Sequence, residues 1–450
     1  MKNLNLMGIK SSRLWLIFIL KTLTIATYSQ NPPYDIFPDV EPPYYKVRYE
    51  ASTNPGELVF PVSYTIWIPQ GVSYLKGVIV HQHGCGTGSC GTGLAGAFDL
   101  HWQALAKKHQ CALLSPSYEQ PEAGSCALWC DPRNGSDVKF QKSLVDLGSI
   151  SGHPELSSVP WTLWGHSGGG VWVGFMTMMH PERIAAVWLN SGTPIIADSP
   201  GQLTKKIDIP DEVVGVPMMC NLGTQEGVTM KEGKHAGRWA ATEEFFNEVR
   251  SKGGLIGVAV DPLTGHPTGN QRYLAIPWFD ACLEARLPLK NGAPMRTMPE
   301  DEAWFAPLLG TKASPASQFT GDKNRALWLP NETVAKVWEH FVRDTEIPDS
   351  TPPPAPFNFK SNGGHLTWNA EADLESGIAY FIIERDGKVI AKVPEEPGNP
   401  NSRPVFQGMR DSDTPVLHIR EMQFTDTHTN PGQKHTYKVF SVNTTGLKSE

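Results

Sequence analysis

The central part of the chain alternates short apolar runs with segments of helical periodicity. Each apolar run ends in a small or polar cluster, as strands buried on both faces do. These runs are KGVIVHQHG, CALLSPSY, WTLWGHS, AAVWLNSG, VPMMCNLG and LIGVAVDP. Between them, DLHWQALAKKH, VWVGFMTMMHPER and HAGRWAATEEFFNEVRSKGG carry apolar residues at helical spacing. Because strands and helices alternate, the pattern predicts an α/β fold with a mostly parallel sheet covered on both faces.

The periodicity changes on both sides of this region. The segments YKVRYEAS and LVFPVSYTIWIP alternate in part and predict two antiparallel strands before it, and LPNETVAKVWEHFVRD predicts an amphipathic helix that closes it. TPPPAP at 351–356 cannot continue a helix and predicts a stiff extended linker. Beyond the linker, HLTWNA, GIAYFIIERDG, KVIAKVP, REMQFTD and HTYKVFSVN alternate with period two. This pattern predicts a small antiparallel sandwich with Trp368 and Tyr437 in its core.

The first residues are typical of a secretory signal peptide. Basic residues precede an apolar run at 14–20, and small residues follow before Gln30, where cleavage is predicted. An N-terminal membrane anchor is the alternative because Lys21 interrupts the apolar region, although the run is short for a span. We expect residues 1–29 to be a signal peptide and the protein to be secreted, periplasmic or at the cell surface.

Composition narrows the class of protein and its partners. A length of 450 residues is enough for an enzyme of two or three domains, and 18 Phe, 14 Trp and 11 Tyr argue against disorder. The net charge is -7, and no basic run follows the pattern that tracks a phosphate backbone. We therefore expect no nucleic-acid partner.

Export places the 7 cysteines in an oxidising compartment. An odd number leaves at least one of them unpaired. Local pairs such as Cys85 with Cys90, or Cys126 with Cys130, fit the spacing, but the sequence leaves the connectivity open. A zinc site is the less favoured interpretation, since the cysteine spacings come without a matching histidine pair.

The motif Gly165-His166-Ser167-Gly168-Gly169 follows a predicted strand and precedes a predicted helix. Strand, glycine turn and helix together form a nucleophile elbow, in which the glycines allow a strained turn that raises the serine hydroxyl above the sheet. Ser167 is therefore the predicted nucleophile. A glycine-rich connection without a function is the alternative.

Two later loops supply a base and an acid, which a serine hydroxyl needs before it can act as a nucleophile. His266 lies between Gly265 and Pro267 in a predicted loop, and Glu226 follows a predicted strand in NLGTQEGV. Serine, acid and histidine thus occur in the chain order of α/β-hydrolases. Asp261, on the same loop as the histidine, is the alternative acid, although we interpret it as a local turn former. Plain surface charge is the other interpretation of both carboxylates.

Backbone amides must also bind the oxyanion that forms during acyl transfer. Gly168 at the start of the predicted helix and Cys85 in HGCG, after an earlier strand, are the predicted donors. His81 and His83 are two apart on that strand and would also suit a metal pair, but no third ligand has a fitting spacing. We expect neither a metal ion nor a cofactor.

HGCG after one strand, GHSGG after a later strand, and then an acid loop and a histidine loop resemble secreted α/β-hydrolase esterases. The resemblance is strongest to the polyhydroxybutyrate depolymerase and feruloyl esterase group and covers about residues 46–344. The residues from 351 on, with DLESGIAYFIIERDG and YKVFSVNTTG, resemble a fibronectin type III module. The chain departs from the group by using Glu226 where Asp is commoner. It also departs by an insert at 118–135, in which Trp129 would line a cleft if it is exposed.

The resemblance implies a doubly wound α/β-hydrolase domain over 30–350, followed by a fibronectin type III-like sandwich over 351–450. Together with the predicted catalytic triad of nucleophile Ser167, base His266 and acid Glu226, it predicts a secreted serine hydrolase that cleaves small or polymeric carboxylic esters through an acyl-enzyme. The sandwich would be a spacer or would dock on a polysaccharide or polymer surface, by analogy with secreted depolymerases.

The sequence leaves two alternative functions open. One is a serine peptidase of the same fold; esters are favoured because the catalytic region begins soon after the predicted signal peptide, without the large N-terminal domain of cleft-restricting peptidases. The other is a non-catalytic surface protein for binding or adhesion, which predicts a broken triad.

Overall fold

The computed structural model describes residues 40–198, 204–344, 346–395, 422–430 and 432–450. The predicted signal peptide at 1–29 lies outside this part of the chain. No helix within the described ranges is long and apolar enough to cross a membrane.

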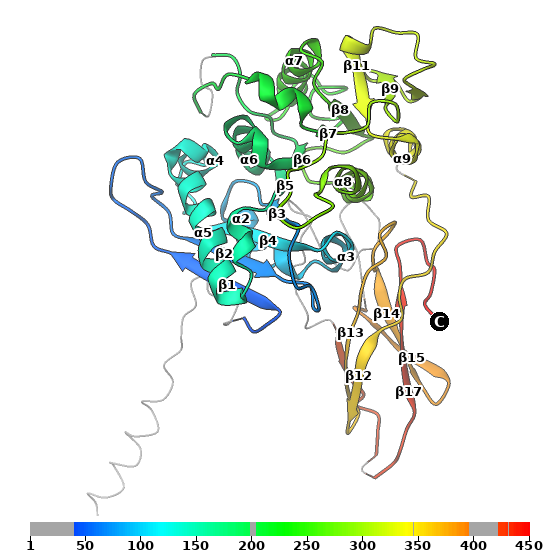
Figure 1. Cartoon of the computed structure of the whole chain (residues 1–450). Coiled ribbons are helices and arrows are strands. Elements are labelled where there is room, and N and C mark those ends of the chain that lie inside the picture. Colours follow the sequence, from blue (N-terminus) through cyan, green and yellow to red (C-terminus); the bar gives the residue numbers. More distant parts are fainter. Residues whose placement is uncertain (1–39, 199–203, 345, 396–421, 431) are drawn as a thin grey trace, which may run out of the picture. The chain divides into compact units, whose positions relative to one another are not determined.

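An eight-stranded sheet forms the centre of the fold, in the order β1-β2-β4-β3-β5-β6-β7-β8 (Figure 1). Its strands are β1 (Tyr44–Tyr49), β2 (Val62–Trp67), β3 (Gly77–Gln82), β4 (Cys111–Tyr118), β5 (Trp161–His166), β6 (Ile184–Asn190), β7 (Met218–Gly223) and β8 (Ile256–Asp261). The pairs β1–β2 and β2–β4 are antiparallel, and every later pair is parallel. All the apolar runs and both flanking strands predicted from the sequence therefore occur, and the α/β class is confirmed.

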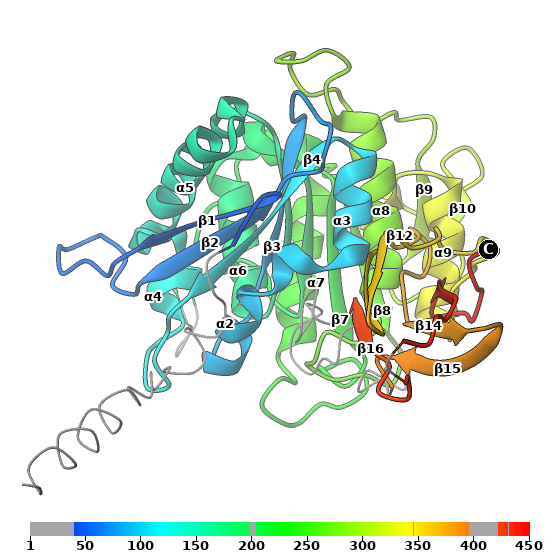
Figure 2. The same ribbon diagram turned by 90° about the horizontal axis from the view of Figure 1, so that it is seen from below.

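Helices cover both faces of this sheet, with α3 and α8 on one side and α5 and α6 on the other (Figure 2). The helices are α2 (Thr87–Gly93), α3 (Leu100–Lys108), α4 (Ala127–Cys130), α5 (Ser136–Ser151), α6 (Gly168–Met179), α7 (Arg238–Ser251), α8 (Arg272–Arg286) and α9 (Glu332–Arg343). Local capping sets some of their starts: the Asp99 carboxylate accepts hydrogen bonds from two amides of α3, and the Asn331 side chain accepts one from Val334 in α9. Because both faces are covered, all residues of β3 and β5 are buried, which explains their continuous apolar runs.

The strand order reverses around β3, whose neighbours are β4 and β5. In open α/β sheets the loops at the carboxyl ends of strands near such a reversal form the binding crevice. Here the loops after β3, β5, β7 and β8 carry Cys85, Ser167, Glu226 and His266 respectively. The parallel strands therefore deliver four distant segments of the chain to one edge of the sheet.

Smaller sheets follow the central one. A three-stranded sheet consists of β9 (Trp304–Pro307), β10 (Ser314–Pro315) and β11 (Ala326–Leu329). The C-terminal region has two more, formed by β12 (Phe357–Asn362), β13 (His365–Asn369) and β16 (Gln423–Thr425), and by β15 (Lys388–Val393), β14 (Tyr380–Arg385) and β17 (Tyr437–Val442). Trp368 is buried and Tyr437 is half-buried against the same apolar cluster, as predicted. The predicted strands thus form two small antiparallel sheets.

Candidate active site

Ser167 occupies a sharp turn between β5 and α6. Its φ and ψ are 55° and −116°, a strained combination for a residue with a side chain. The glycines around it are required by close backbone contacts: a Cβ on Gly165 would lie 2.2 Å from the carbonyl oxygen of Gly169, and one on Gly169 would lie 2.4 Å from that of His83. The local sequence therefore forces the nucleophile-elbow geometry, with the serine at the N-terminal end of a helix.

A continuous chain of hydrogen bonds joins the three residues that the sequence singled out. The Nε2 atom of His266 lies 2.9 Å from the Ser167 Oγ atom, and its Nδ1 atom lies 2.7 Å from the Glu226 Oε1 atom. Ser167 is half-buried, the His266 side chain is 18% exposed, and the Glu226 side chain is almost fully buried. The hydroxyl is thus accessible while its acid partner is shielded from water.

Two further donors hold the Glu226 carboxylate. The hydroxyl of Ser191 and the amide of Gly223 both donate to Glu226 Oε2, at 2.6 and 3.0 Å. Burial by itself raises the pKa of this carboxyl, but the hydrogen bonds from His266, Ser191 and Gly223 outweigh it and lower the pKa below its usual range. Glu226 is therefore ionised at neutral pH, with Oε1 reserved for the histidine.

Asp261 makes a different set of contacts. Its Oδ2 atom accepts a hydrogen bond from the amide of Asn270 at 3.0 Å, and a Cβ on Gly269 would lie 2.4 Å from the same oxygen. The side chain thus braces the loop that carries His266, as expected for a local turn former. The imidazole of that loop, His266, forms its Nδ1 hydrogen bond with Glu226.

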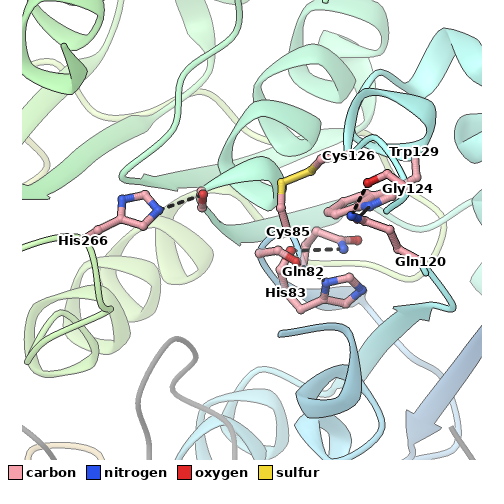
Figure 3. The surroundings of a disulfide bond; sticks show 10 residues. Gln82, His83, Cys85, Gln120, Gly124, Cys126, Trp129 and His266 are labelled. Atoms are coloured by element: carbon pink, nitrogen blue, oxygen red, sulfur yellow. Dashed lines mark hydrogen bonds between the residues drawn. A yellow bond between two sulfur atoms is a disulfide. The ribbon is translucent and has the colours of Figure 1, made fainter. Parts of the chain in front are cut away.

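The loop after β3 lies beside the elbow and is tied to the insert by a disulfide between Cys85 and Cys126 (Figure 3). A Cβ on Gly168 would lie 2.1 Å from the Cys85 sulfur and 2.5 Å from the Cys126 sulfur. The disulfide therefore packs directly on the first residue of α6, whose amide has no partner within the helix. Both amides predicted to bind an oxyanion lie next to this bond.

This connectivity differs from the local pairs considered for the sequence. The remaining cysteines, Cys90, Cys111, Cys130, Cys220 and Cys282, are free and buried. Neither Cys90 nor Cys130 can pair with its near neighbour because Cys85 and Cys126 bind each other across 41 positions. Spacing alone could not find this pair, since the sheet brings the two segments together.

Trp129, in the insert, is fully buried and does not line a cleft, contrary to the sequence-based interpretation. Its ring stacks on Tyr118 with centroids 4.7 Å apart, and its indole N–H donates to Gln120 Oε1 at 2.7 Å. The Gln120 amide in turn donates to the Gly124 carbonyl at 2.8 Å (Figure 3). These contacts anchor the insert on β4 and so fix the position of Cys126.

His83 and His81 serve packing and backbone contacts. The His83 Nδ1 atom donates to the Gly84 carbonyl at 2.6 Å, and its Nε2 atom accepts from the Tyr118 amide at 3.1 Å. Burial lowers the pKa of His83 to about 4, so it is neutral, as these two roles require. His81 stacks on Trp164 with ring centroids 3.9 Å apart. Within the described ranges, neither His81 nor His83 belongs to a group of side chains close enough together to bind a metal ion.

Three residues that the sequence did not single out also contact the triad: Ser191 as described above, His166 and His235. The His166 Nε2 atom donates to the backbone carbonyl of His266 at 2.8 Å and so fixes the histidine loop. The His235 ring lies flat on that of His266, with centroids 3.7 Å and planes 5° apart. His166 belongs to the elbow motif itself. His235 is the first residue of the predicted helical segment HAGRWAATEEFFNEVRSKGG, although the helix begins only at Arg238, and no motif marked it as a site residue.

The contact between Gly168 and the disulfide leads to a testable expectation. The substitution Gly168→Ala forces either the disulfide or the elbow to move, and with it both candidate oxyanion donors; the loss of one such donor costs roughly 10²- to 10³-fold in kcat. We expect a fall of about this size on a chromogenic ester, and partial recovery when Cys126→Ala removes one of the two sulfurs.

Gly215→Ala is the matched control, because a Cβ at Gly215 meets no atom within 4 Å. Circular dichroism should show that both alanine variants fold. Full activity of Gly168→Ala would mean that the Cys85 and Gly168 amides do not bind the oxyanion.

No model of a protein family matches the chain, and no curated protein is similar to it. Among solved structures it is similar to a thermostable esterase, at 15% identity and a TM-score of 0.35, over 49% of this chain and 55% of that chain. It is also similar to an S-formylglutathione hydrolase from Agrobacterium tumefaciens (14% identity, TM-score 0.35, 54% and 93% of the two chains). A third is a carboxyl esterase from Bacillus coagulans (9% identity, TM-score 0.34, 54% and 97%). The chain thus spans about half of the length of the thermostable esterase.

Proposed function

We propose that the protein is a serine hydrolase of the α/β-hydrolase type that cleaves carboxylic esters through an acyl-enzyme. The observation that carries this proposal is the hydrogen-bonded chain Ser167–His266–Glu226, placed at the carboxyl edge of a parallel sheet with the serine in a strained turn. Such a chain has a specific use: it lets an uncharged hydroxyl lose its proton as it attacks a carbonyl carbon.

In this mechanism the Ser167 Oγ atom forms a bond to the ester carbonyl carbon while His266 Nε2 takes the hydroxyl proton. Glu226 stabilises the resulting imidazolium through Nδ1, and the amides of Cys85 and Gly168 bind the negatively charged oxygen. The imidazolium then donates its proton to the departing alkoxide, which leaves as the alcohol. A water molecule repeats the sequence on the acyl-enzyme, and the acid and free Ser167 are released.

The proposal extends to location and to the C-terminal region. Secretion is supported by the composition of residues 1–29 and by the Cys85–Cys126 disulfide, because disulfides persist in oxidising compartments. For residues 351–450 we propose a fibronectin type III-like module that holds the enzyme near a polymeric substrate; the two small antiparallel sheets and the buried Trp368 support it.

The test combines a substrate panel with covalent labelling. We expect hydrolysis of chromogenic esters from acetyl to long-chain acyl groups and feruloyl, little hydrolysis of the matched anilides, and loss of activity in proportion to labelling by a fluorophosphonate. Mass spectrometry should place the adduct on the peptide that contains Ser167. Faster hydrolysis of the anilides would indicate a peptidase, and the absence of both turnover and adduct would indicate a non-catalytic binding protein.

A further inference from the structure

His235 lies on the loop between β7 and α7, the same loop that carries Glu226. The amide of Trp239 donates to the Glu226 carbonyl at 2.9 Å, which closes this loop. A Cβ on Gly227 would lie 2.1 Å from the Ala236 carbonyl oxygen, so the two ends of the loop pack tightly on each other. His235 is therefore held over the imidazole of His266, where its ring stacks at 3.7 Å.

We propose that Glu226, His235 and His266 form a binding site for a divalent transition-metal ion such as Zn²⁺, and that the bound ion switches the triad off. One ligand atom from each of the three residues lies within 4.8 Å of the other two. A carboxylate with two imidazoles is a ligand set that Zn²⁺ uses in sites that keep a fourth position open for water. Binding of the ion is independent of the proposed function, whereas its inhibitory effect rests on it.

The His235 imidazole is available as a ligand. Its Nδ1 atom is buried and makes no hydrogen bond to any residue of the described part of the chain. An imidazole coordinates a metal ion through such a ring nitrogen.

The stacked arrangement limits how tightly an ion can bind. In a tetrahedral site with Zn–N bonds of about 2.0 Å, ligand atoms are roughly 3.3 Å apart. Glu226 Oε1 and His266 Nδ1, at 2.7 Å, are already closer than this, so the main movement is that of the His235 nitrogen, which starts within 4.8 Å of the other two ligand atoms. In stacked rings the nitrogen lone pairs lie in parallel planes and do not converge on one point. His235 must therefore rotate about its side-chain bonds before both imidazoles can bind the same ion. Because His235 is only half-buried, it has room to turn. We expect a dissociation constant on the order of micromolar, far weaker than that of structural zinc sites.

Coordination would place the catalytic histidine in the wrong tautomer. In the free enzyme, the Nδ1–H group of His266 donates a hydrogen bond to Glu226, and Nε2 accepts a hydrogen bond from the Ser167 hydroxyl. An ion on the Glu226 side takes the lone pair of Nδ1, so the single proton of the neutral ring resides on Nε2. That nitrogen can then only donate to Ser167 and cannot accept its proton. No proton is released overall, since the ion replaces the N–H as the partner of the carboxylate.

The test measures binding without activity. Zinc chloride is titrated calorimetrically into the full-length Ser167→Ala protein, which keeps all three ligands, and into the same protein carrying His235→Phe or His235→Ala. We expect a single site whose dissociation constant rises roughly tenfold or more in both variants, because one of three protein ligands is lost. His340→Phe is the matched control: it disrupts the other candidate group, His340, Asp344 and Glu346, and should change nothing at this site.

An activity measurement completes the design. In protein with Ser167 present, buffered Zn²⁺ should inhibit ester hydrolysis reversibly, a chelator should restore it, and His235→Phe should raise the inhibitory concentration by a similar factor relative to its own uninhibited rate. Circular dichroism establishes that the variants fold. Equal zinc affinity with and without His235, or no saturable binding, would overturn the site. Zinc binding that depends on His235 in a protein without esterase activity would keep the site and reject the proposed function.

Discussion

Replacing Ser167 with alanine is expected to lower kcat on chromogenic esters by roughly 10⁴- to 10⁶-fold, the loss seen when the nucleophile of a serine hydrolase is removed. The reason is that the neighbouring hydroxyl cannot take its place: Ser191, which also contacts the triad, donates to the buried Oε2 atom of Glu226 and does not face the imidazole Nε2. KM should change little, since the substitution removes a single hydroxyl and leaves the surrounding loops intact. The measurement is initial-rate kinetics at saturating ester with both proteins at matched concentration.

Stability provides the control for this variant. Ser167 has φ of 55°, and alanine must adopt the same left-handed conformation, so a melting temperature within a few degrees of the wild type shows that the elbow is kept. The fluorophosphonate adduct should disappear as well. Turnover that persists in a folded, unlabelled Ser167→Ala protein would assign the nucleophile to another residue.

Much of the fold follows from periodicity in the sequence. Strands such as β3 and β5 are buried on both faces, so most of their side chains are apolar or small, and a short continuous run of that kind is typical of a central strand. The small sheet of β9, β10 and β11 was not predicted because strands of two to four residues carry too little pattern to be read. Helix α5 was missed because Val138, Val145 and Ile150 are exposed on it, which blurs its apolar face.

The juxtaposition of Ser167, Glu226 and His266 could be predicted because each follows a parallel strand, and the carboxyl ends of such strands meet at one edge. The contacts around them could not. Cys126 reaches Cys85 only because Trp129 and Gln120 anchor the insert on β4, and His235 reaches His266 only because its loop closes on Glu226. These are contacts between side chains of separate loops, which leave no periodic signal in the chain.

Replacing Glu226 with glutamine is expected to lower kcat by about 10³- to 10⁴-fold, more than the loss of one neutral hydrogen bond. The surroundings decide which way the new amide points. Ser191 and Gly223 both donate to the Oε2 position, so the glutamine oxygen must occupy it and the NH₂ group must face His266. An NH₂ group donates, so Nδ1 must accept and the imidazole proton moves to Nε2, which then cannot take the proton of Ser167.

The matched variant, Asp261→Asn, tests which of the two acids considered from the sequence, Glu226 or Asp261, orients His266. Because Asp261 Oδ2 accepts from the Asn270 amide and lies against Gly269, the asparagine oxygen can keep that contact while the triad stays intact. We expect a change in kcat of less than about tenfold and a modest fall in melting temperature. Both variants should be compared by kcat and thermal melting under the same conditions. If Asp261→Asn loses more activity than Glu226→Gln while both proteins remain folded, the acid that orients His266 during catalysis is Asp261, and the contact at Glu226 is not the one used.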